Sequence, residues 1–137
     1  MGFEKFGTVS FTAETKAADF ISFLEKGKVE ATKCKKCGRI YFPPRMQCAD
    51  DLSSDVEWID LSDSGKLLTY TTVQYGPTGF ENDAPYTLAV VEFNNGVRVF
   101  GRLDKSLPPA EIKVGMQVKA EPLKLPGDKI SYQFVKA

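Results

Sequence analysis

Four residues in the first half of the chain have the types and the spacing of a metal site. Cys34 and Cys37 are separated by two residues, and Cys48 and Asp51 repeat that spacing further along the chain. Each pair places two ligands one turn apart, so that both can reach the same ion. Zinc accepts sulfur and oxygen ligands in a tetrahedron, at about 2.3 Å to sulfur and about 2.0–2.2 Å to a carboxylate oxygen. The sequence therefore predicts one zinc ion bound by these four side chains.

The predicted ion is structural rather than catalytic. Four protein ligands leave no open coordination position, so the binding energy of the metal acts as folding energy. Asp50 is the alternative fourth ligand, but Asp51 fits the repeated spacing. Two further alternatives are a ribbon that folds without metal and an iron redox centre, which would need four thiolates for its usual chemistry.

Catalytic residues of the usual kinds are missing from the sequence. It contains no histidine, which removes the common general base near neutral pH and every Ser-His or Cys-His mechanism. The predicted metal site uses all three cysteines, and no paired-carboxylate or phosphate-loop motif is present. We therefore expect this chain to supply no catalytic residue.

The composition is that of an ordinary globular protein. The 137 residues suffice for one domain with a small appendage, and 18 basic residues balance 18 acidic ones. A net charge of zero excludes a general attraction to nucleic acid or anionic lipid, and no apolar run reaches the ~20 residues that span a bilayer. Three clustered cysteines fit a metal site in a reducing compartment better than a disulfide. We expect a cytoplasmic protein that does not associate with membranes.

The segment 13–26 has the periodicity of an amphipathic helix. Phe20, Ile21 and Leu24 fall on one helical stripe, and Gly27 follows where a C-terminal cap is expected. Because the stripe is narrow, the helix is expected on a surface of this protein or of a partner. Packing against its own domain is the equal alternative.

Short strands separated by turns fill the rest of the chain, so the predicted class is mainly β. Strands at 29–34 and 39–44 flank the turn that carries two cysteines and form a metal-knuckle hairpin. The later strands predict a small five-stranded barrel such as the OB-fold, with a β-sandwich as the main alternative. These barrel strands are expected at 65–76, 86–93, 97–103, 116–121 and 130–135, with residues 56–61 forming another strand ahead of them.

Two places have the character of a contact site. The loop 76–85 joins the first two barrel strands, where OB-folds commonly bind ligands, and Phe80 and Tyr86 could offer apolar contacts there. An exposed connecting loop is the equal alternative. Phe42 and Arg45 lie among basic residues of the hairpin and are candidate contacts for an acidic partner or for phosphates, although a solvated basic face is the simpler reading.

Taken together, five segments resemble a known family. They are CKKCGRIYFPPRMQC, VEWIDLSDSGKLLTYTTV, APYTLAVVEF, GVRVFGRL and VGMQV. The chain resembles, over nearly its whole length, the acyl-CoA-associated OB-fold family with an N-terminal rubredoxin-like zinc ribbon, long labelled a domain of unknown function. The resemblance implies an N-terminal helical segment at 1–28, a zinc ribbon at 29–55 and an OB-fold domain at 56–137.

The resemblance also implies a function. Members of this family are small accessory or scaffold subunits of thiolases and of lipid-transfer-type thiolase-like enzymes, in which the partner supplies the catalytic cysteine. The implied role is to stabilise that partner, and coenzyme A or an acyl-CoA is the ligand expected in the complex. Cys34, Cys37 and Cys48 match the zinc ligands of the family, and Asp51 stands in place of the fourth cysteine.

Two other function classes compete with this reading. Zinc ribbons and OB-folds also occur in nucleic-acid-binding modules, which stack bases on aromatic side chains in a basic groove. Neutral net charge weighs against that class, and Tyr70, Tyr75 and Phe100 alternate as core residues would. An independent enzyme acting on acyl-CoA, such as a thioesterase, has only the loop 76–85 and scattered carboxylates to support it.

Overall fold

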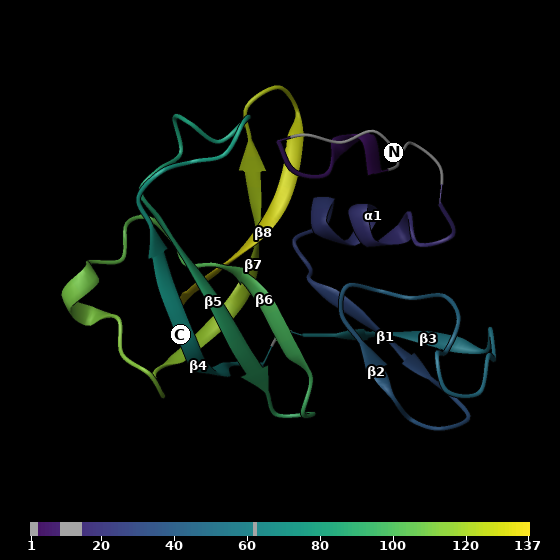
Figure 1. Ribbon diagram of the computed structural model, residues 1–137. Helices are drawn as coiled ribbons and strands as arrows, with labels where there is room; N and C mark the ends of the chain where they lie inside the picture. Colours follow the sequence, from purple (N-terminus) through teal and green to yellow (C-terminus); the bar gives the residue numbers. More distant parts are fainter. Residues whose placement is uncertain (1–2, 9–14, 62) are drawn as a thin grey trace.

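The structure is a computed structural model that describes residues 3–8, 15–61 and 63–137. It contains a three-stranded and a five-stranded β-sheet, and one α-helix packs against strands of both (Figure 1). The helical elements, in which η marks a 3-10 helix, are η1 (Phe3–Lys5), α1 (Asp19–Glu25) and η2 (Pro109–Glu111). The strands are β1 (Glu30–Cys34), β2 (Ile40–Tyr41), β3 (Val56–Asp60), β4 (Gly65–Val73), β5 (Tyr86–Phe93), β6 (Arg98–Arg102), β7 (Gln117–Leu125) and β8 (Lys129–Lys136).

The smaller sheet has the order β2-β1-β3 and is antiparallel throughout. β2 ends at Tyr41, earlier than the expected residue 44, because two prolines follow soon after and cannot donate to a ladder. β3 pairs with β1 over five residues, from Glu30 opposite Asp60 to Cys34 opposite Val56. The strand expected at 56–61 therefore belongs to the sheet of the metal hairpin, whereas the predicted domain limits place it in the OB-fold. The domain limits themselves stay a prediction.

The larger sheet has the order β6-β5-β4-β7-β8, and all of its neighbouring strands are antiparallel. It curls until the end of β6 meets β8, where Leu103 forms a parallel bridge with Phe134 and the N–H of Asp104 donates to the Phe134 carbonyl at 2.8 Å. No continuous ladder joins β6 to β8 in the described ranges, so the barrel is partly open, as OB-folds are. The predicted class, mainly β with an OB-fold, is confirmed.

Strand ends in the larger sheet differ from expectation at two places. β4 ends at Val73 rather than at residue 76, and β7 continues to Leu125 rather than ending at 121. β7 contains Pro122, which usually argues against a paired strand. Because β7 pairs with β4 only at Gln117 and Val118, one side of the strand is free at Pro122, and the missing N–H costs no ladder bond there.

Helix α1 packs on its own chain, which was the second of the two expectations for it. Phe20, Ile21 and Leu24 are all buried. The helix is shorter than the predicted span 13–26, of which residues 13 and 14 lie outside the described residues. It ends in a full Schellman motif: Gly27 has φ 86°, its N–H donates to the carbonyl of Leu24, and the N–H of Lys28 donates to the carbonyl of Phe23.

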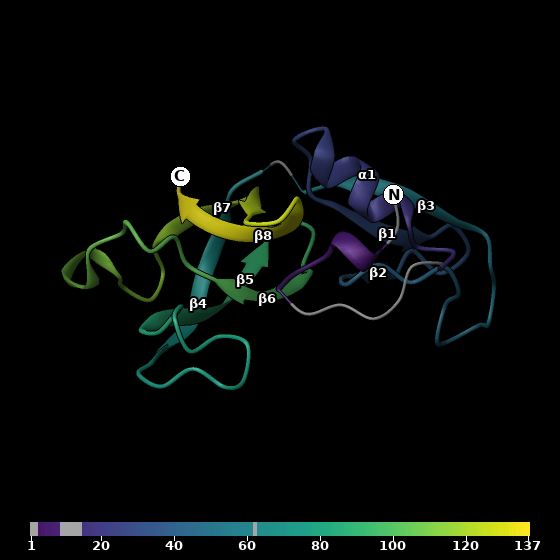
Figure 2. The ribbon, with the colours of Figure 1, turned by 90° about the horizontal axis from the view of Figure 1, so that it is seen from above.

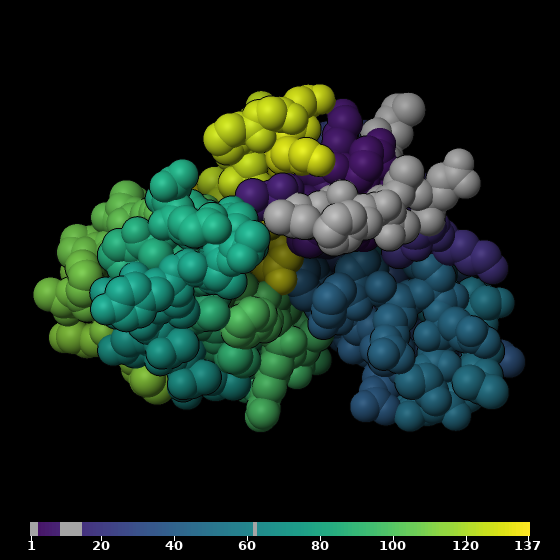
Figure 3. Space-filling model, turned by 45° about the horizontal axis from the view of Figure 1, so that its top comes forward, coloured from purple at the N-terminus to yellow at the C-terminus, as the bar shows by residue number. Residues whose placement is uncertain are grey.

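Five aromatic rings connect the two sheets; we call them the aromatic junction. Phe20 on α1 lies 5.7 Å, centroid to centroid, from Phe42 of the metal hairpin, and Phe42 lies 5.1 Å from Tyr132 on β8. Phe3 and Phe6 complete the set against Phe20. Burial raises the pKa of Tyr132 to about 12. Seen from above, α1 lies over the smaller sheet, and η1 lies between that sheet and β8 (Figure 2). The space-filling view shows the two groups of strands as two lobes (Figure 3).

Three aromatic residues that alternate as core residues in the sequence are exposed instead. The exposed fraction is 90% for Tyr75, 58% for Phe100 and 40% for Tyr70. The expectation was wrong for Tyr70 and Phe100 because a period of two does not say which face of a strand is buried, and it was wrong for Tyr75 because that residue lies beyond the end of β4 at Val73. In the described part of the chain, no helix has the length and apolar character needed to cross a lipid bilayer.

Glu30, the first residue of β1, is a buried carboxylate whose charge is poorly compensated. It is 7% exposed, and within the described part of the chain its Oε2 atom has no hydrogen-bond partner. Burial raises its pKa above the ordinary 4.5, the charge of Asp60 opposite it adds to the rise, and Lys28 offsets part of it. The ionised form therefore costs folding free energy near neutral pH.

We expect Glu30→Gln to raise the free energy of unfolding at neutral pH by about 1 kcal/mol, the order of one unsatisfied buried polar group. Because the folded pKa lies above the unfolded value of 4.5, the wild type gains stability as the pH falls from neutral through that raised pKa, and the variant lacks this gain. Urea unfolding at several pH values measures both the stability difference at neutral pH and its dependence on pH. Glu57→Gln, on the exposed side of β3, is the control and should change neither the stability nor its pH dependence.

Candidate metal centre

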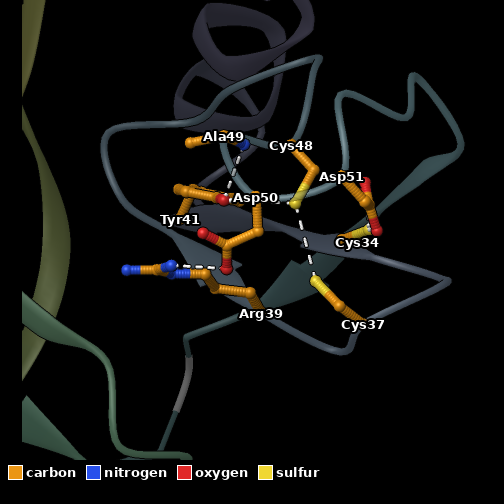
Figure 4. Close-up of polar contacts among 8 residues, drawn as sticks. All are labelled: Cys34, Cys37, Arg39, Tyr41, Cys48, Ala49, Asp50 and Asp51. Atoms are coloured by element: carbon orange, nitrogen blue, oxygen red, sulfur yellow. Dashed lines mark hydrogen bonds and ion pairs between the residues drawn. The ribbon is translucent and has the colours of Figure 1, made fainter.

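The four predicted ligands come together at one end of the smaller sheet. Cys34 ends β1, and its Sγ lies 3.5 Å from Asp51 Oδ2, while the Sγ atoms of Cys37 and Cys48 are also 3.5 Å apart (Figure 4). All four ligand atoms lie within 4.8 Å of one another. A tetrahedral ion at about 2.3 Å from its sulfur ligands needs ligand separations of about 3.7 Å. The donor set and its spacing therefore fit one zinc ion.

Two turns of the same geometry present these ligands. In the first, the N–H of Gly38 donates to the carbonyl of Cys34, and the N–H of Cys34 donates to the carbonyl of Arg39. In the second, the N–H of Leu52 donates to the carbonyl of Cys48, and the N–H of Cys48 donates to the carbonyl of Ser53. Gly38 and Leu52 both have positive φ, at 78° and 58°. Asp51 thus stands in the second turn where Cys37 stands in the first.

Leu52 adopts a backbone conformation that favours glycine. Its side chain is 70% exposed, so no burial of that side chain compensates for the strain. We expect Leu52→Gly to raise the free energy of unfolding by about 0.5–1 kcal/mol, because relief of the left-handed strain outweighs the extra entropy of an unfolded glycine. Thermal unfolding of the zinc-loaded protein checks this. Val114→Gly is the matched control, since Val114 is 65% exposed without a positive φ, and it should destabilise.

Hydrogen bonds around the ligands favour their ionised forms. The N–H of Ser53 donates to Asp51 Oδ1 at 2.9 Å and lowers the pKa of that carboxyl. The hydroxyl of Tyr41 lies 3.3 Å from Cys48 Sγ and lowers the pKa of that thiol, while accepting the N–H of Ala49. Only ionised carboxyl and thiol groups serve as zinc ligands. Tyr41 was not among the sequence candidates, and its place in a strand between two knuckles gave no separate signal.

The thiol of Cys37 is the ligand group that most needs a cation to become ionised. The N–H of Arg39 lowers the pKa of its thiol, but Cys48, burial and Cys34 together outweigh that effect and raise the pKa to about 11. Neighbouring thiolates repel one another, and a divalent ion among them reverses this balance. Bound zinc would hold all three thiols in the ionised form and add Lewis acidity only if a ligand left, since the four side chains fill its coordination.

Asp50, the alternative ligand, is engaged elsewhere. Its Oδ2 lies 2.5 Å from Arg39 Nη1 in an exposed ion pair on the outside of the turn (Figure 4). The carboxylate that joins the three thiols is that of Asp51. Ligation by Asp51 stays a prediction, and the geometry supports it over Asp50.

The four candidate contact residues do not form one site. Phe42 belongs to the aromatic junction, whereas Arg45 is exposed and its guanidinium lies 5.5 Å from the Tyr41 ring centroid. Phe80 lines a hollow of the larger sheet, and Tyr86 pairs with Val73 at the start of β5, outside that hollow. Their roles as partner or acyl-CoA contacts stay predictions.

Family models match the chain as a zinc ribbon followed by an OB-fold domain. Residues 22–57 match the model described as the ChsH2 rubredoxin-like zinc ribbon domain, and residues 58–121 match the ChsH2 C-terminal OB-fold domain. A solved structure titled Ltp2-ChsH2(DUF35) aldolase superposes with a TM-score of 0.74 at 23% identity, covering 92% of this chain and 98% of that one, which supports the fold.

Curated relatives extend the comparison. A DUF35 domain-containing scaffold protein of Methanocaldococcus jannaschii is 39% identical over 64% of this chain and 62% of its own length, so the match spans less than two thirds of that protein. The scaffold protein of the same description from Pyrococcus furiosus is 38% identical over 71% of this chain and 70% of its own length. The benzoylsuccinyl-CoA thiolase subunit BbsA of Geobacter metallireducens is 29% identical over 76% of this chain and 71% of its own length. The chain therefore belongs to the DUF35 family, in which a rubredoxin-like zinc ribbon is combined with an OB-fold domain.

Proposed function

We propose that this chain is a non-catalytic, zinc-binding accessory subunit that docks on a thiolase or thiolase-like enzyme of acyl-CoA metabolism and stabilises it. The observation that carries the proposal is the metal centre: four side chains of the chain itself supply its ligands, so the ion is a structural part of a docking module. Relatives described as scaffold proteins and as a thiolase subunit support the same role. Three thiol ligands need a reducing compartment, so we place the complex in the cytoplasm.

The exposed basic face of the ribbon is the part we expect to meet the partner. The guanidinium groups of Arg39 and Arg45 both lie over the Tyr41 ring, at 5.8 and 5.5 Å from its centroid, so both belong to the surface around that ring. Asp50 neutralises Arg39, whereas no ion pair is seen for Arg45 within the described residues. An arginine presented in this way is typical of interface anchors.

Co-expression with the thiolase-like protein of the same organism tests the proposal. We expect a complex that co-purifies at fixed stoichiometry through an affinity tag on either chain, with a partner that loses solubility or activity when expressed alone. Arg45→Glu should weaken the complex at least about tenfold, and Arg98→Glu, on the other lobe, should leave it unchanged. A partner that is soluble, active and unassociated without this chain would refute the role.

The nucleic-acid alternative gains one observation, the exposed rings of Tyr70 and Phe100. The Tyr70 hydroxyl, however, donates to the carbonyl of Ile112, which holds that ring against the chain, and the net charge of zero offers no field for a polyanion. We predict no binding of a single-stranded thymidine oligonucleotide at physiological ionic strength, measured by fluorescence anisotropy across a salt series. Micromolar binding with a steep salt dependence would contradict this.

A further inference from the structure

A hollow of about 370 Å³ lies at the open seam of the larger sheet, between β6 and β8. Residues 6–8 of the N-terminal segment line one side of it, and the loop between β4 and β5 contributes the ring of Phe80. Side chains from six separate parts of the chain line it, and most of them are apolar: Phe6, Phe80, Leu88, Phe100, Leu123 and Tyr132. Ligand pockets of this size are typically apolar with a few well-placed polar groups.

The main chain sets the shape of this hollow. A Cβ at Gly101 would lie 2.9 Å from ring carbons of both Tyr132 and Phe134, so only glycine lets β6 approach β8 at this point. The hydroxyl of Tyr132 donates to the carbonyl of Phe100, which ties the strand edges together. The ring of Phe100 remains 58% exposed beside this tie. The close approach of β6 and β8 at Gly101 therefore forms a fixed boundary of the hollow.

An ion-pair cluster with an excess of positive charge is centred on Arg102, a residue that lines the hollow. Asp83 Oδ2 lies 3.1 Å from Arg102 Nη1, and Asp83 Oδ1 lies 3.4 Å from Lys105 Nζ. Burial raises the pKa of Asp83, but the two cations outweigh it and lower the pKa overall, so the carboxyl is ionised at neutral pH. Two cations thus share one carboxylate, which leaves one net positive charge. Arg102 also lines the hollow.

We propose that this hollow binds a small amphipathic anion, with an acyl chain on the apolar walls and the anionic group beside Arg102. At a liquid share of about 30 Å³ per water-sized group, the space suits about a dozen heavy atoms, the size of decanoate. The inference deepens the acyl-CoA part of the proposed function and rests on it for the biological source of the acyl chain. It does not depend on which partner the ribbon contacts.

Titration calorimetry of the full zinc-loaded chain tests this, with decanoate, decanoyl-coenzyme A and free coenzyme A as probes. We expect one decanoate or decanoyl group per chain and no binding of free coenzyme A. Tighter binding of decanoyl-coenzyme A than of decanoate supports the thioester as the source, and the reverse order supports the free acid. Absence of binding by both acyl probes, or equal binding by free coenzyme A, would overturn the inference.

Matched variants tie the binding to the hollow. Phe100→Ala and, on a separate segment, Phe80→Ala should each weaken decanoate binding about tenfold, and Arg102→Gln should weaken it to a similar extent. Tyr75→Ala and Arg98→Gln remove the same side-chain types at exposed positions outside the hollow and should stay within about twofold of wild type. Equal effects of the test and control variants would overturn the inference. Absence of acyl binding by the wild-type chain together with co-purification of the partner would overturn the inference too, while leaving the accessory role intact.

Discussion

Replacing Asp51 by alanine should loosen the zinc ion, and replacing it by cysteine should tighten it. Alanine removes one of four ligands and admits water, so we expect an affinity about 10–100-fold below that of the wild type. Cysteine completes a four-thiolate set at the same turn position, and thiolate binds zinc more tightly than carboxylate does. Metal analysis of the purified protein and competition against a chromogenic chelator measure both changes, with about one zinc per wild-type chain expected.

Asp50→Ala is the matched control for this series. Its carboxylate is one residue from Asp51 but pairs with Arg39 outside the ligand cluster, so its loss should leave zinc affinity within about twofold of wild type. Unchanged affinity in Asp51→Ala would remove Asp51 from the site and leave the three cysteines in it. If only Asp50→Ala weakened zinc binding, Asp50 rather than Asp51 would be the fourth ligand.

Much of the metal centre was predictable because its information is local. The two ligand pairs have identical spacing, and each turn closes through hydrogen bonds between residues four and five apart, from Cys34 to Arg39 and from Cys48 to Ser53. β5 was predicted with its bounds at 86 and 93, because Pro85 precedes it and Asn94 begins the turn that follows. Signals of this kind need no knowledge of distant contacts.

What the sequence could not supply is non-local. Residues 56–60 read as one more strand before a barrel, and only their pairing with residues 30–34 assigns them to the ribbon sheet. Phe42 resembles an exposed interface residue beside two prolines, and its contacts with Phe20 and Tyr132 join residues far apart in the chain. The charge of the ion-pair cluster at the hollow likewise depends on Asp83 meeting Arg102 and Lys105 in space.

Truncating Phe20 should produce the largest loss of stability of any single substitution in the aromatic junction. Its ring is 2% exposed and lies within about 6 Å, between centroids, of three other rings. We expect Phe20→Ala to lower the free energy of unfolding by about 3–5 kcal/mol, because the buried ring leaves a cavity that rigid neighbours cannot fill. Urea unfolding measures the loss. Phe100→Ala, which removes the same side chain from an exposed position, should cost less than about 0.5–1 kcal/mol.

The same variant shows whether the junction makes the two sheets unfold together. Phe42 reaches Phe20 on one side and Tyr132 of β8 on the other, so it is the ring through which the ribbon contacts the larger sheet. A double-mutant cycle of Phe20→Ala and Phe42→Ala should give a coupling of about 0.5–1.5 kcal/mol, the range for aromatic pairs in contact. Zinc stoichiometry should stay at that of the wild type in all three variants, because neither residue is a predicted ligand. Additive effects together with two separate unfolding transitions, one sensitive to chelator and one not, would mean that the ribbon and the OB-fold are stable independently of the junction.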